Sequence, residues 1–194
     1  MKKYAFVGTH GAGKTTLVHI LRDRFLRDFP EKKIEVVDEV ARSCPFPISD
    51  KESGSKSLPN TYMWITCEQI QKEMEARFKK PDYILCDRSV IDPQMYYDGY
   101  IDTVIEIMQD LIAVWNSEQY DKIFVLYTTP DLRIVDDNRR CLDLEFRNKI
   151  NRTFLDYFEF TNEKTVFAIS TEELFSDQGQ KLVDKIYAEC FLGI

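Results

Sequence analysis

The sequence predicts a three-layer α/β fold, in which helices cover both faces of a doubly wound, five-stranded parallel sheet. Three features of the 194-residue chain support this prediction. Short apolar runs of strand length alternate with segments of helical period, and this order requires crossover connections between parallel strands. The runs are almost continuously apolar, as in strands that are buried on both sides. Polar and charged side chains follow the ends of these runs, where open α/β sheets bind their ligands.

The N-terminal part of the chain predicts a strand, a turn, a helix and a second strand. Residues 3–7 form an apolar run that leads into a glycine-rich segment. A helix is expected after that segment up to about residue 29, because Pro30 follows and proline cannot continue a helix. Residues 33–37 include the run Ile-Glu-Val-Val and predict the second strand.

A segment rich in proline and serine separates the second strand from the next helix. Residues 44–60 therefore predict a polar, mobile loop. Residues 61–78 predict a helix, which Pro81 terminates. Its apolar side chains recur with helical period and predict one buried face, formed by Met63, Cys67, Ile70, Met74 and Phe78.

The alternation continues through the middle of the chain. Residues 83–86 and 122–127 are the third and fourth apolar runs, and both predict strands. Residues 103–117 predict the helix between them. Its expected buried face carries Val104, Ile107, Met108, Leu111 and Trp115.

The C-terminal part predicts a helix, a strand and a last helix. Residues 143–160 predict a helix that is charged on one side and apolar on the other, and residues 165–169 predict the fifth strand. The apolar positions expected to be buried in the two helices are Ile150, Phe154 and Phe158, and then Leu182, Val183, Ile186, Tyr187 and Cys190. The length fits a single domain over residues 1–194 better than two domains.

Composition excludes several classes of protein. Hydrophobic residues make up 44% of the chain, which is too many for an intrinsically disordered protein. The net charge of −7 argues against binding to long nucleic acid, which usually requires a basic face. No apolar run approaches the ~20 residues that span a bilayer, and no signal peptide is expected. The five scattered cysteines form no disulfide framework or zinc motif, so we expect a cytoplasmic protein.

The glycine-rich segment carries the most specific motif of the sequence. Gly8-Thr-His-Gly-Ala-Gly-Lys-Thr15 matches the Walker A pattern in full, between a predicted strand and a predicted helix. The motif predicts a P-loop NTPase that binds ATP and Mg²⁺, with Lys14 at the β- and γ-phosphates and Thr15 in the magnesium shell. His10 is interpreted as a polar group at the rim of the loop. The expected nucleotide-binding residues are Gly8, Thr9, His10, Gly11, Ala12, Gly13, Lys14, Thr15 and Thr16.

Two predicted strands end in acidic residues that compete for the metal. Asp38 and Glu39 look like the acidic pair of hydrolytic ATPases, but they follow the second strand only 24 residues after Lys14. That pair normally follows a later strand beside the phosphate loop. Asp87, which ends the third strand, is therefore the better candidate for a second magnesium ligand.

This assignment leaves the acids after the second strand free for another task. A kinase must hold the acceptor hydroxyl in line with the γ-phosphate and accept its proton. Glu39 is the first candidate for this carboxylate and Asp38 is the alternative. Both could instead be structural, since one could cap a helix or pair with Arg42.

A segment with many charges follows the fourth predicted strand. Residues 130–152 contain several arginines near the start of a helix and predict a short helical lid. Arginines delivered by a closing lid neutralise charge on the transferring phosphoryl group, and Arg140 and Arg147 are the best candidates. The alternative is a solvated helix face with pairs such as Asp143 with Arg147.

These stretches together resemble a known family. The chain is similar to AAA_28-type P-loop domains, which include the ribosylnicotinamide kinase domain, and more distantly to deoxynucleoside kinases. The resemblance is carried by the Walker A segment, by Val37-Asp-Glu-Val-Ala-Arg42, by Asp87-Arg-Ser89 and by Asp136-Asp-Asn-Arg-Arg140 with Arg147. It implies that Arg88 orients acceptor and phosphates and that Arg42 lies near the acceptor pocket.

The expected function is phosphoryl transfer from Mg-ATP to a hydroxyl of a small nucleoside-type acceptor. The acceptor could be a nucleoside, a nucleotide or nicotinamide riboside, and the protein is expected to be a monomer or a homodimer. A regulatory or mechanical ATPase, or a kinase of nucleic-acid 5′ ends or modified bases, is the alternative. Aromatic residues that could stack on a base, or simply form core, are Tyr62, Trp64, Tyr96, Tyr97 and Tyr100.

Overall fold

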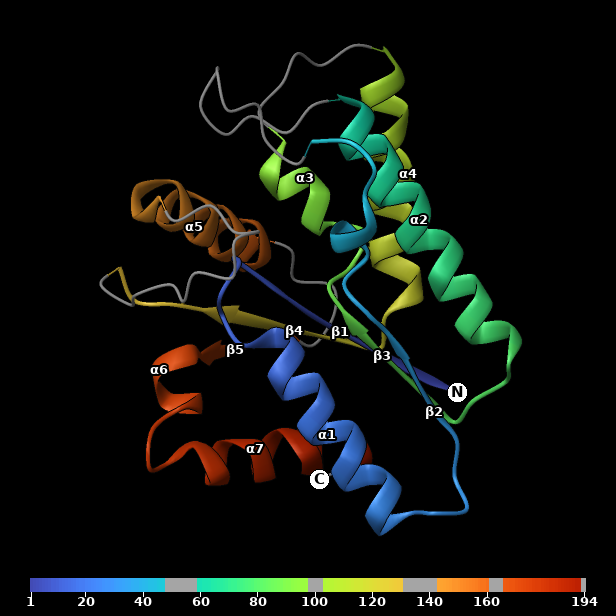
Figure 1. Cartoon of the computed structure of the whole chain (residues 1–194), viewed down its shortest axis with the longest axis vertical. Coiled ribbons are helices and arrows are strands. Elements are labelled where there is room, and N and C mark those ends of the chain that lie inside the picture. Colours follow the sequence, from blue (N-terminus) through green and yellow to red (C-terminus); the bar gives the residue numbers. More distant parts are fainter. Residues whose placement is uncertain (48–58, 98–102, 131–142, 161–165, 193–194) are drawn as a thin grey trace.

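A computed structural model describes residues 1–47, 59–97, 103–130, 143–160 and 166–192. It confirms the expected fold class, a five-stranded parallel sheet with helices on both sides (Figure 1). The strands lie in the order β2-β3-β1-β4-β5, and every neighbouring pair is parallel. They are β1 (Lys2–Gly8), β2 (Ile34–Val37), β3 (Tyr83–Asp87), β4 (Lys122–Tyr127) and β5 (Val166–Ser170).

The longer helices follow the predicted ranges closely. They are α1 (Lys14–Asp28), α2 (Pro59–Phe78), α4 (Thr103–Gln119), α5 (Leu144–Phe160) and α7 (Gly179–Tyr187), which a π-helix extends over Ala188–Leu192. The sequence analysis missed three short helices, namely the 3-10 helix Val40–Ser43, α3 (Asp92–Tyr96) and α6 (Thr171–Leu174). A helix of about one turn lacks the repeated apolar period on which such predictions depend.

The hydrophobic core has one layer on each face of the sheet. Tyr4 and Phe6 of β1 pack on α1 and α7, whereas Ala5 and Val7 pack on the layer that contains α2, α3, α4 and α5. This alternation follows from the two-residue period of a strand. The same period directs the side chain of Lys3 into the α2–α4 layer, where it is only 3% exposed.

Two predictions of buried helix faces were only partly right. Of the predicted face of α2, Met63 and Ile70 do pack against the core. On α2, Met74 and Phe78 are 58% and 87% exposed, and Cys67 is also exposed. The buried face of α2 carries Gln69 and Glu73 instead, because the charged Lys3 lies beneath it and requires polar partners.

On α4, the prediction also chose the wrong side for most positions. Val104, Ile107 and Leu111 are exposed, whereas Ile105 and Ile112 are buried beside Met108, which was placed correctly. Apolar side chains lie all around this helix, so their period alone does not determine which face is buried. The predicted apolar sides of α5 and α7 are confirmed, with Phe154 and Ile186 among the buried residues.

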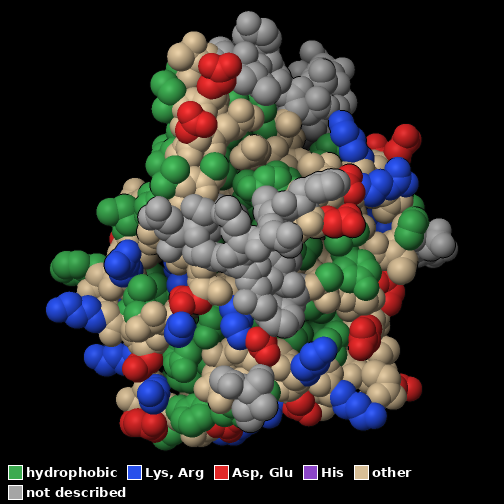
Figure 2. Space-filling model, turned by 180° about the vertical axis from the view of Figure 1, so that it is seen from behind, with side chains coloured by type: hydrophobic (Ala, Val, Ile, Leu, Met, Phe, Trp, Pro, Cys, Tyr) green, Lys and Arg blue, Asp and Glu red, His purple; other side chains and the backbone are tan. Residues whose placement is uncertain are grey.

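Charged side chains of both signs are mixed on the surface. On the face seen from behind, Lys and Arg side chains are scattered among Asp and Glu side chains rather than gathered into a basic patch (Figure 2). Among the helices of the described ranges, none is long and apolar enough to cross a membrane.

Candidate active site

The phosphate loop joins β1 to α1, and its backbone requires glycine at two positions. Gly8 has φ +132°, and a Cβ there would lie 2.1 Å from the carbonyl oxygen of Leu126 in β4. Gly13 has φ +84°, and a Cβ there would lie 2.6 Å from the ring of Phe175. The loop therefore turns sharply into α1, whose first backbone N–H groups form a site for anions.

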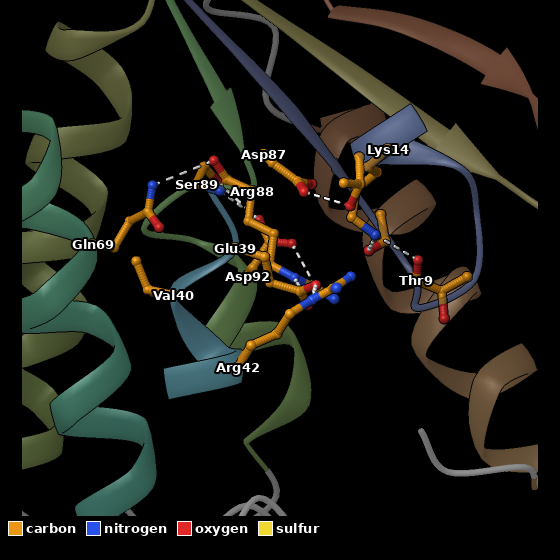
Figure 3. Close-up of polar contacts among 12 residues, drawn as sticks. Thr9, Lys14, Glu39, Val40, Arg42, Gln69, Asp87, Arg88, Ser89 and Asp92 are labelled. Atoms are coloured by element: carbon orange, nitrogen blue, oxygen red, sulfur yellow. Dashed lines mark hydrogen bonds and ion pairs between the residues drawn. The ribbon is translucent and has the colours of Figure 1, made fainter. Parts of the chain in front are cut away.

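Lys14 is the first residue of α1, and its ammonium group lies inside the loop. Its Nζ donates to the carbonyl oxygens of Gly8 at 3.0 Å and Thr9 at 2.7 Å, and its side chain is buried (Figure 3). Burial, and then the nearby charge of Arg88, lower the pKa of Lys14 from 10.5 to about 8. Both acceptors of these hydrogen bonds are neutral carbonyl groups, and a phosphate group bound beside Nζ would supply a negative counter-charge.

The residues expected to hold magnesium lie together. Thr15 Oγ1 donates to Asp87 Oδ2 at 2.5 Å, which joins the start of α1 to the end of β3. Asp87 is 1% exposed, and its Oδ1 has no hydrogen-bond partner among the described residues. A hydroxyl and a carboxylate with a free, buried oxygen are ligands that suit Mg²⁺, so the residues present fit this metal.

Arg88 follows β3 in a strained backbone conformation. Its φ is +93°, which a residue with a side chain adopts at a cost of about 1–3 kcal/mol. Its Nε donates to Glu39 Oε1 at 2.6 Å, its Nη1 donates to Asp92 Oδ1 at 3.0 Å, and its guanidinium lies 5.7 Å from the ring centre of Tyr96. The arginine is therefore fixed from three sides, with 11% of its side chain exposed.

Glu39 lies between two arginines. Its Oε1 accepts from Arg88, and its Oε2 accepts from Arg42 Nε at 2.7 Å (Figure 3). Burial alone would raise the pKa of Glu39, but the charges of Arg88, Lys14 and Arg42 hold this pKa well below its usual range. Glu39 therefore remains an ionised acceptor of hydrogen bonds, and it is better suited to orienting a hydroxyl than to retaining its proton.

The two acids after β2 have different surroundings. The side chain of Asp38 is 79% exposed, and its Oδ1 lies 3.6 Å from Nε2 of His19 in α1. The side chain of Glu39 is 15% exposed and faces Arg88. Successive residues of an extended chain point in opposite directions, which explains this difference. The structure therefore brings Glu39, and not Asp38, into the arginine cluster.

The lid prediction is only partly covered by the described residues. Residues 131–142, which include Arg140, lie outside the described residues, as do residues 48–58 of the predicted loop 44–60. Arg147 lies in the first turns of α5, where it is buried and its Nη2 donates to the carbonyl oxygens of Thr129 and Pro130 at 3.3 and 3.2 Å. Its guanidinium therefore contacts the segment that follows β4, where the predicted lid begins.

The candidate aromatic residues separate into core and site. Tyr62 is fully buried and its ring centre lies 4.8 Å from that of Tyr97, so it belongs to the core. His10 is 9% exposed, and its ring centre lies 6.3 Å from those of Tyr96 and Phe146. Tyr96 thus lies beside His10 of the phosphate loop, whereas Tyr100 falls outside the described residues.

Asp92 was missed by the sequence analysis. Its Oδ2 accepts from the backbone N of Ser89 at 2.8 Å and from Ser89 Oγ at 3.1 Å, while its Oδ1 accepts from Arg88. Burial raises the pKa of Asp92, and the charges of Arg88 and Lys14 oppose this shift. A serine three residues before an acid is the spacing of a capping box, which could have indicated this contact.

Comparison with known families identifies the chain. A family model described as an AAA domain, AAA_28, matches residues 3–172. The chain belongs to this AAA_28 family. The match covers the phosphate loop, both acidic segments and α5, and it confirms the resemblance seen in the sequence motifs. No curated protein matches the chain.

Solved structures with the same fold include two kinases. Deoxyadenosine kinase from M. mycoides, with products dCMP and a flexible dCDP bound, has a TM-score of 0.68 and 16% identity over 99% of this chain and 100% of that chain. Thymidylate kinase from Ehrlichia chaffeensis has a TM-score of 0.61 and 16% identity over 97% of this chain and 95% of that chain. At this identity the likeness establishes the fold alone, which this chain shares with both kinases.

Proposed function

We propose that the protein is an Mg-ATP-dependent kinase that phosphorylates a hydroxyl of a small nucleoside-type acceptor. The observation that carries the proposal is the largely buried ion pair of Glu39 and Arg88 beside the phosphate loop. An ionised carboxylate that an arginine holds beside the phosphate loop can align an acceptor hydroxyl with the γ-phosphate, as a kinase requires. The fold that this chain shares with two solved kinase structures supports the same proposal.

Each group at the site has a role in this proposal. Lys14 and the backbone of the loop hold the β- and γ-phosphates, and Thr15 with Asp87 would hold Mg²⁺. The metal, when bound, neutralises charge that develops on the phosphate oxygens. Arg140 and Arg147 of the proposed lid would neutralise the charge that remains.

The reaction exchanges one P–O bond for another. A lone pair of the acceptor hydroxyl attacks the γ-phosphorus while the bond to the β–γ bridging oxygen breaks, and that electron pair leaves with ADP. The hydroxyl proton passes to Glu39 and then to solvent, so the low basicity of Glu39 favours its rapid release. Because such transition states are loose, the larger contribution of Glu39 and Arg88 is to hold the hydroxyl in line.

The acceptor proposed first is a nucleoside-type compound that carries no phosphate group. At the entrance to the site, Arg42 and Arg88 already share the carboxylate of Glu39, so they provide little surplus positive charge for a monophosphate. A sugar hydroxyl can accept a hydrogen bond from an arginine and donate one to the carboxylate. Nicotinamide riboside and nucleosides both present such a hydroxyl.

The test measures ADP release with and without candidate acceptors. We expect slow release with ATP alone and a sharp increase with one member of a panel of nucleosides, deoxynucleosides, nicotinamide riboside and monophosphates, with phosphorylated product in equal amount. Short 5′-hydroxyl oligonucleotides complete the panel. Brisk ATP hydrolysis that no acceptor stimulates would refute the kinase proposal and favour a regulatory ATPase.

A further inference from the structure

A buried carboxylate lies behind the proposed active site, on the inner face of α2. Glu73 is 1% exposed and accepts four hydrogen bonds, which is about the capacity of a carboxylate. Its Oε2 accepts from Lys3 Nζ of β1 at 2.7 Å and from Trp115 Nε1 of α4 at 2.9 Å. Its Oε1 accepts from Gln69 Nε2 at 2.9 Å and from the hydroxyl of Tyr120 at 2.5 Å.

The two side chains that donate to Oε1, Gln69 and Tyr120, also contact the backbone of the segment after β3, which contains Arg88. The hydroxyl of Tyr120 accepts from the backbone N of Val90 at 3.2 Å. Gln69 Nε2 makes a longer contact, 3.5 Å, with the carbonyl oxygen of Arg88 (Figure 3). One oxygen of Glu73 is therefore connected through two side chains to the peptide groups on either side of Ser89.

We propose that Glu73, Tyr120 and Gln69 are positioning residues that hold the Arg88 backbone in its left-handed conformation and so aim its guanidinium at Glu39. This inference rests on the proposed function only for its kinetic consequences. The φ of Arg88 is +93°, and such a conformation persists only where the surroundings determine it. The bonds to Val90 N and to Arg88 O, together with the bond from Arg88 N to Phe6 O at 3.0 Å, supply that restraint.

The contribution of Glu73 and its polar partners to the stability of the fold does not by itself account for their presence in the core. A buried ion pair such as Lys3 with Glu73 usually stabilises a fold no more than well-packed apolar side chains of the same size. Each hydrogen bond of Glu73, Gln69 and Tyr120 does, however, have a preferred direction. Together these bonds therefore favour one backbone conformation of the segment after β3. On the inner face of α2, Gln69 and Glu73 are buried beside the apolar Ile65 and Ala76, while Met74 and Phe78 of the same helix are exposed.

The first test observes Arg88 directly and requires no kinase activity. In ¹⁵N-labelled protein, the Nε–H signal of Arg88, identified by its loss in Arg88→Ala, reports the bond to Glu39. Tyr120→Phe removes the hydroxyl that holds Val90 N, and we expect this signal to shift or broaden. Trp115→Phe is the matched control, because it removes a Glu73 bond on the side away from Arg88 and should leave the signal unchanged.

A second variant keeps the test decisive if Tyr120→Phe folds poorly. Gln69→Met retains the size of the side chain and removes the contact with Arg88 O, so it should disturb the same signal. An Arg88 signal that is unchanged in both variants, or that changes equally in Trp115→Phe, would overturn the proposal.

The second test uses turnover with the acceptor found above. Misplaced catalytic groups can cost up to about 100-fold in rate, so we expect Tyr120→Phe to lower kcat by roughly 10- to 100-fold with little change in KM for ATP. In an Arg88→Ala background the same substitution should lower kcat by less than about twofold, because its effect acts through Arg88. Independent, additive losses would show a merely structural role and refute the proposal. If Arg88→Ala itself leaves turnover intact, the proposed function fails, while the Arg88 signal still decides the positioning role.

Discussion

Nucleotide affinity should depend on pH through Lys14, and the dependence can be calculated from its surroundings. In the nucleotide-free protein the pKa of Lys14 is lowered from 10.5 to about 8, first by burial and then by Arg88. Phosphate oxygens beside Nζ favour the charged form, so MgADP binds the protonated lysine. The protonated fraction falls from about one half near pH 8 to about one per cent near pH 10. Affinity should therefore fall about 50-fold over this interval, which is about 2.3 kcal/mol.

Calorimetry in two buffers of different ionisation enthalpy measures both the affinity and the protons bound. Near pH 9 the binding of MgADP should take up close to one proton, and Lys14→Met should abolish that uptake and flatten the pH profile. Phosphate groups of nucleotides are already ionised above about pH 7, so they add little to the signal. Constant affinity between about pH 8 and pH 10 without proton uptake would refute the reasoning.

The same pKa has the opposite consequence for the stability of the nucleotide-free fold. The unfolded chain binds a proton at Lys14 up to 10.5, whereas the folded protein loses it near 8. Between these values the unfolded state binds more protons, so this group makes folding more favourable as the pH rises. Relative to Lys14→Met, the melting temperature of the native protein should therefore increase across this interval.

Three further predictions concern other residues of the site. Glu39→Gln should keep MgATP binding and slow transfer by roughly 10²–10⁴-fold, whereas Asp38→Asn should have little effect, as steady-state ADP release would show; the reverse pattern would exchange their roles. Asp87→Asn should weaken the apparent affinity for Mg²⁺ by roughly 10- to 100-fold in a metal titration of turnover, and an unchanged titration would exclude it as a ligand. Arg140→Ala and Arg147→Ala should each lower kcat more than they raise KM, and an effect confined to KM would make them ground-state clamps.

The strands and the phosphate loop could be predicted because their signals are local. The Walker A segment specifies its own turn through Gly8 and Gly13, and a continuously apolar strand needs no information about its partner. The buried face of α2 could not be predicted in this way. It is determined by Lys3 in β1, which is distant in sequence from Glu73, and a pattern of apolar residues contains no trace of that pairing.

The candidate site was predicted as far as strand order allows. Segments that end neighbouring parallel strands meet at one edge of the sheet, and because β2 lies next to β3, the acids after β2 come close to Arg88. The choice between Asp38 and Glu39 depends on which of two successive side chains points inward. That direction depends on the path of the chain after β2 and on the unusual φ of Arg88, and neither has a sequence signal of its own.

The two arginines on Glu39 differ in a way that explains how an acceptor could enter. Arg88 is 11% exposed and is also held by Asp92, so its bond to Glu39 is fixed before any substrate arrives. Arg42 is 45% exposed, so water can solvate its guanidinium once it leaves the carboxylate. A substrate hydroxyl can therefore replace Arg42 on Glu39 Oε2 more readily than it could replace Arg88, which keeps Oε1 in place. Arg88 then keeps Oε1 of Glu39 fixed. Oε2 accepts the hydrogen bond from the acceptor hydroxyl and so aligns the acceptor with the phosphate loop.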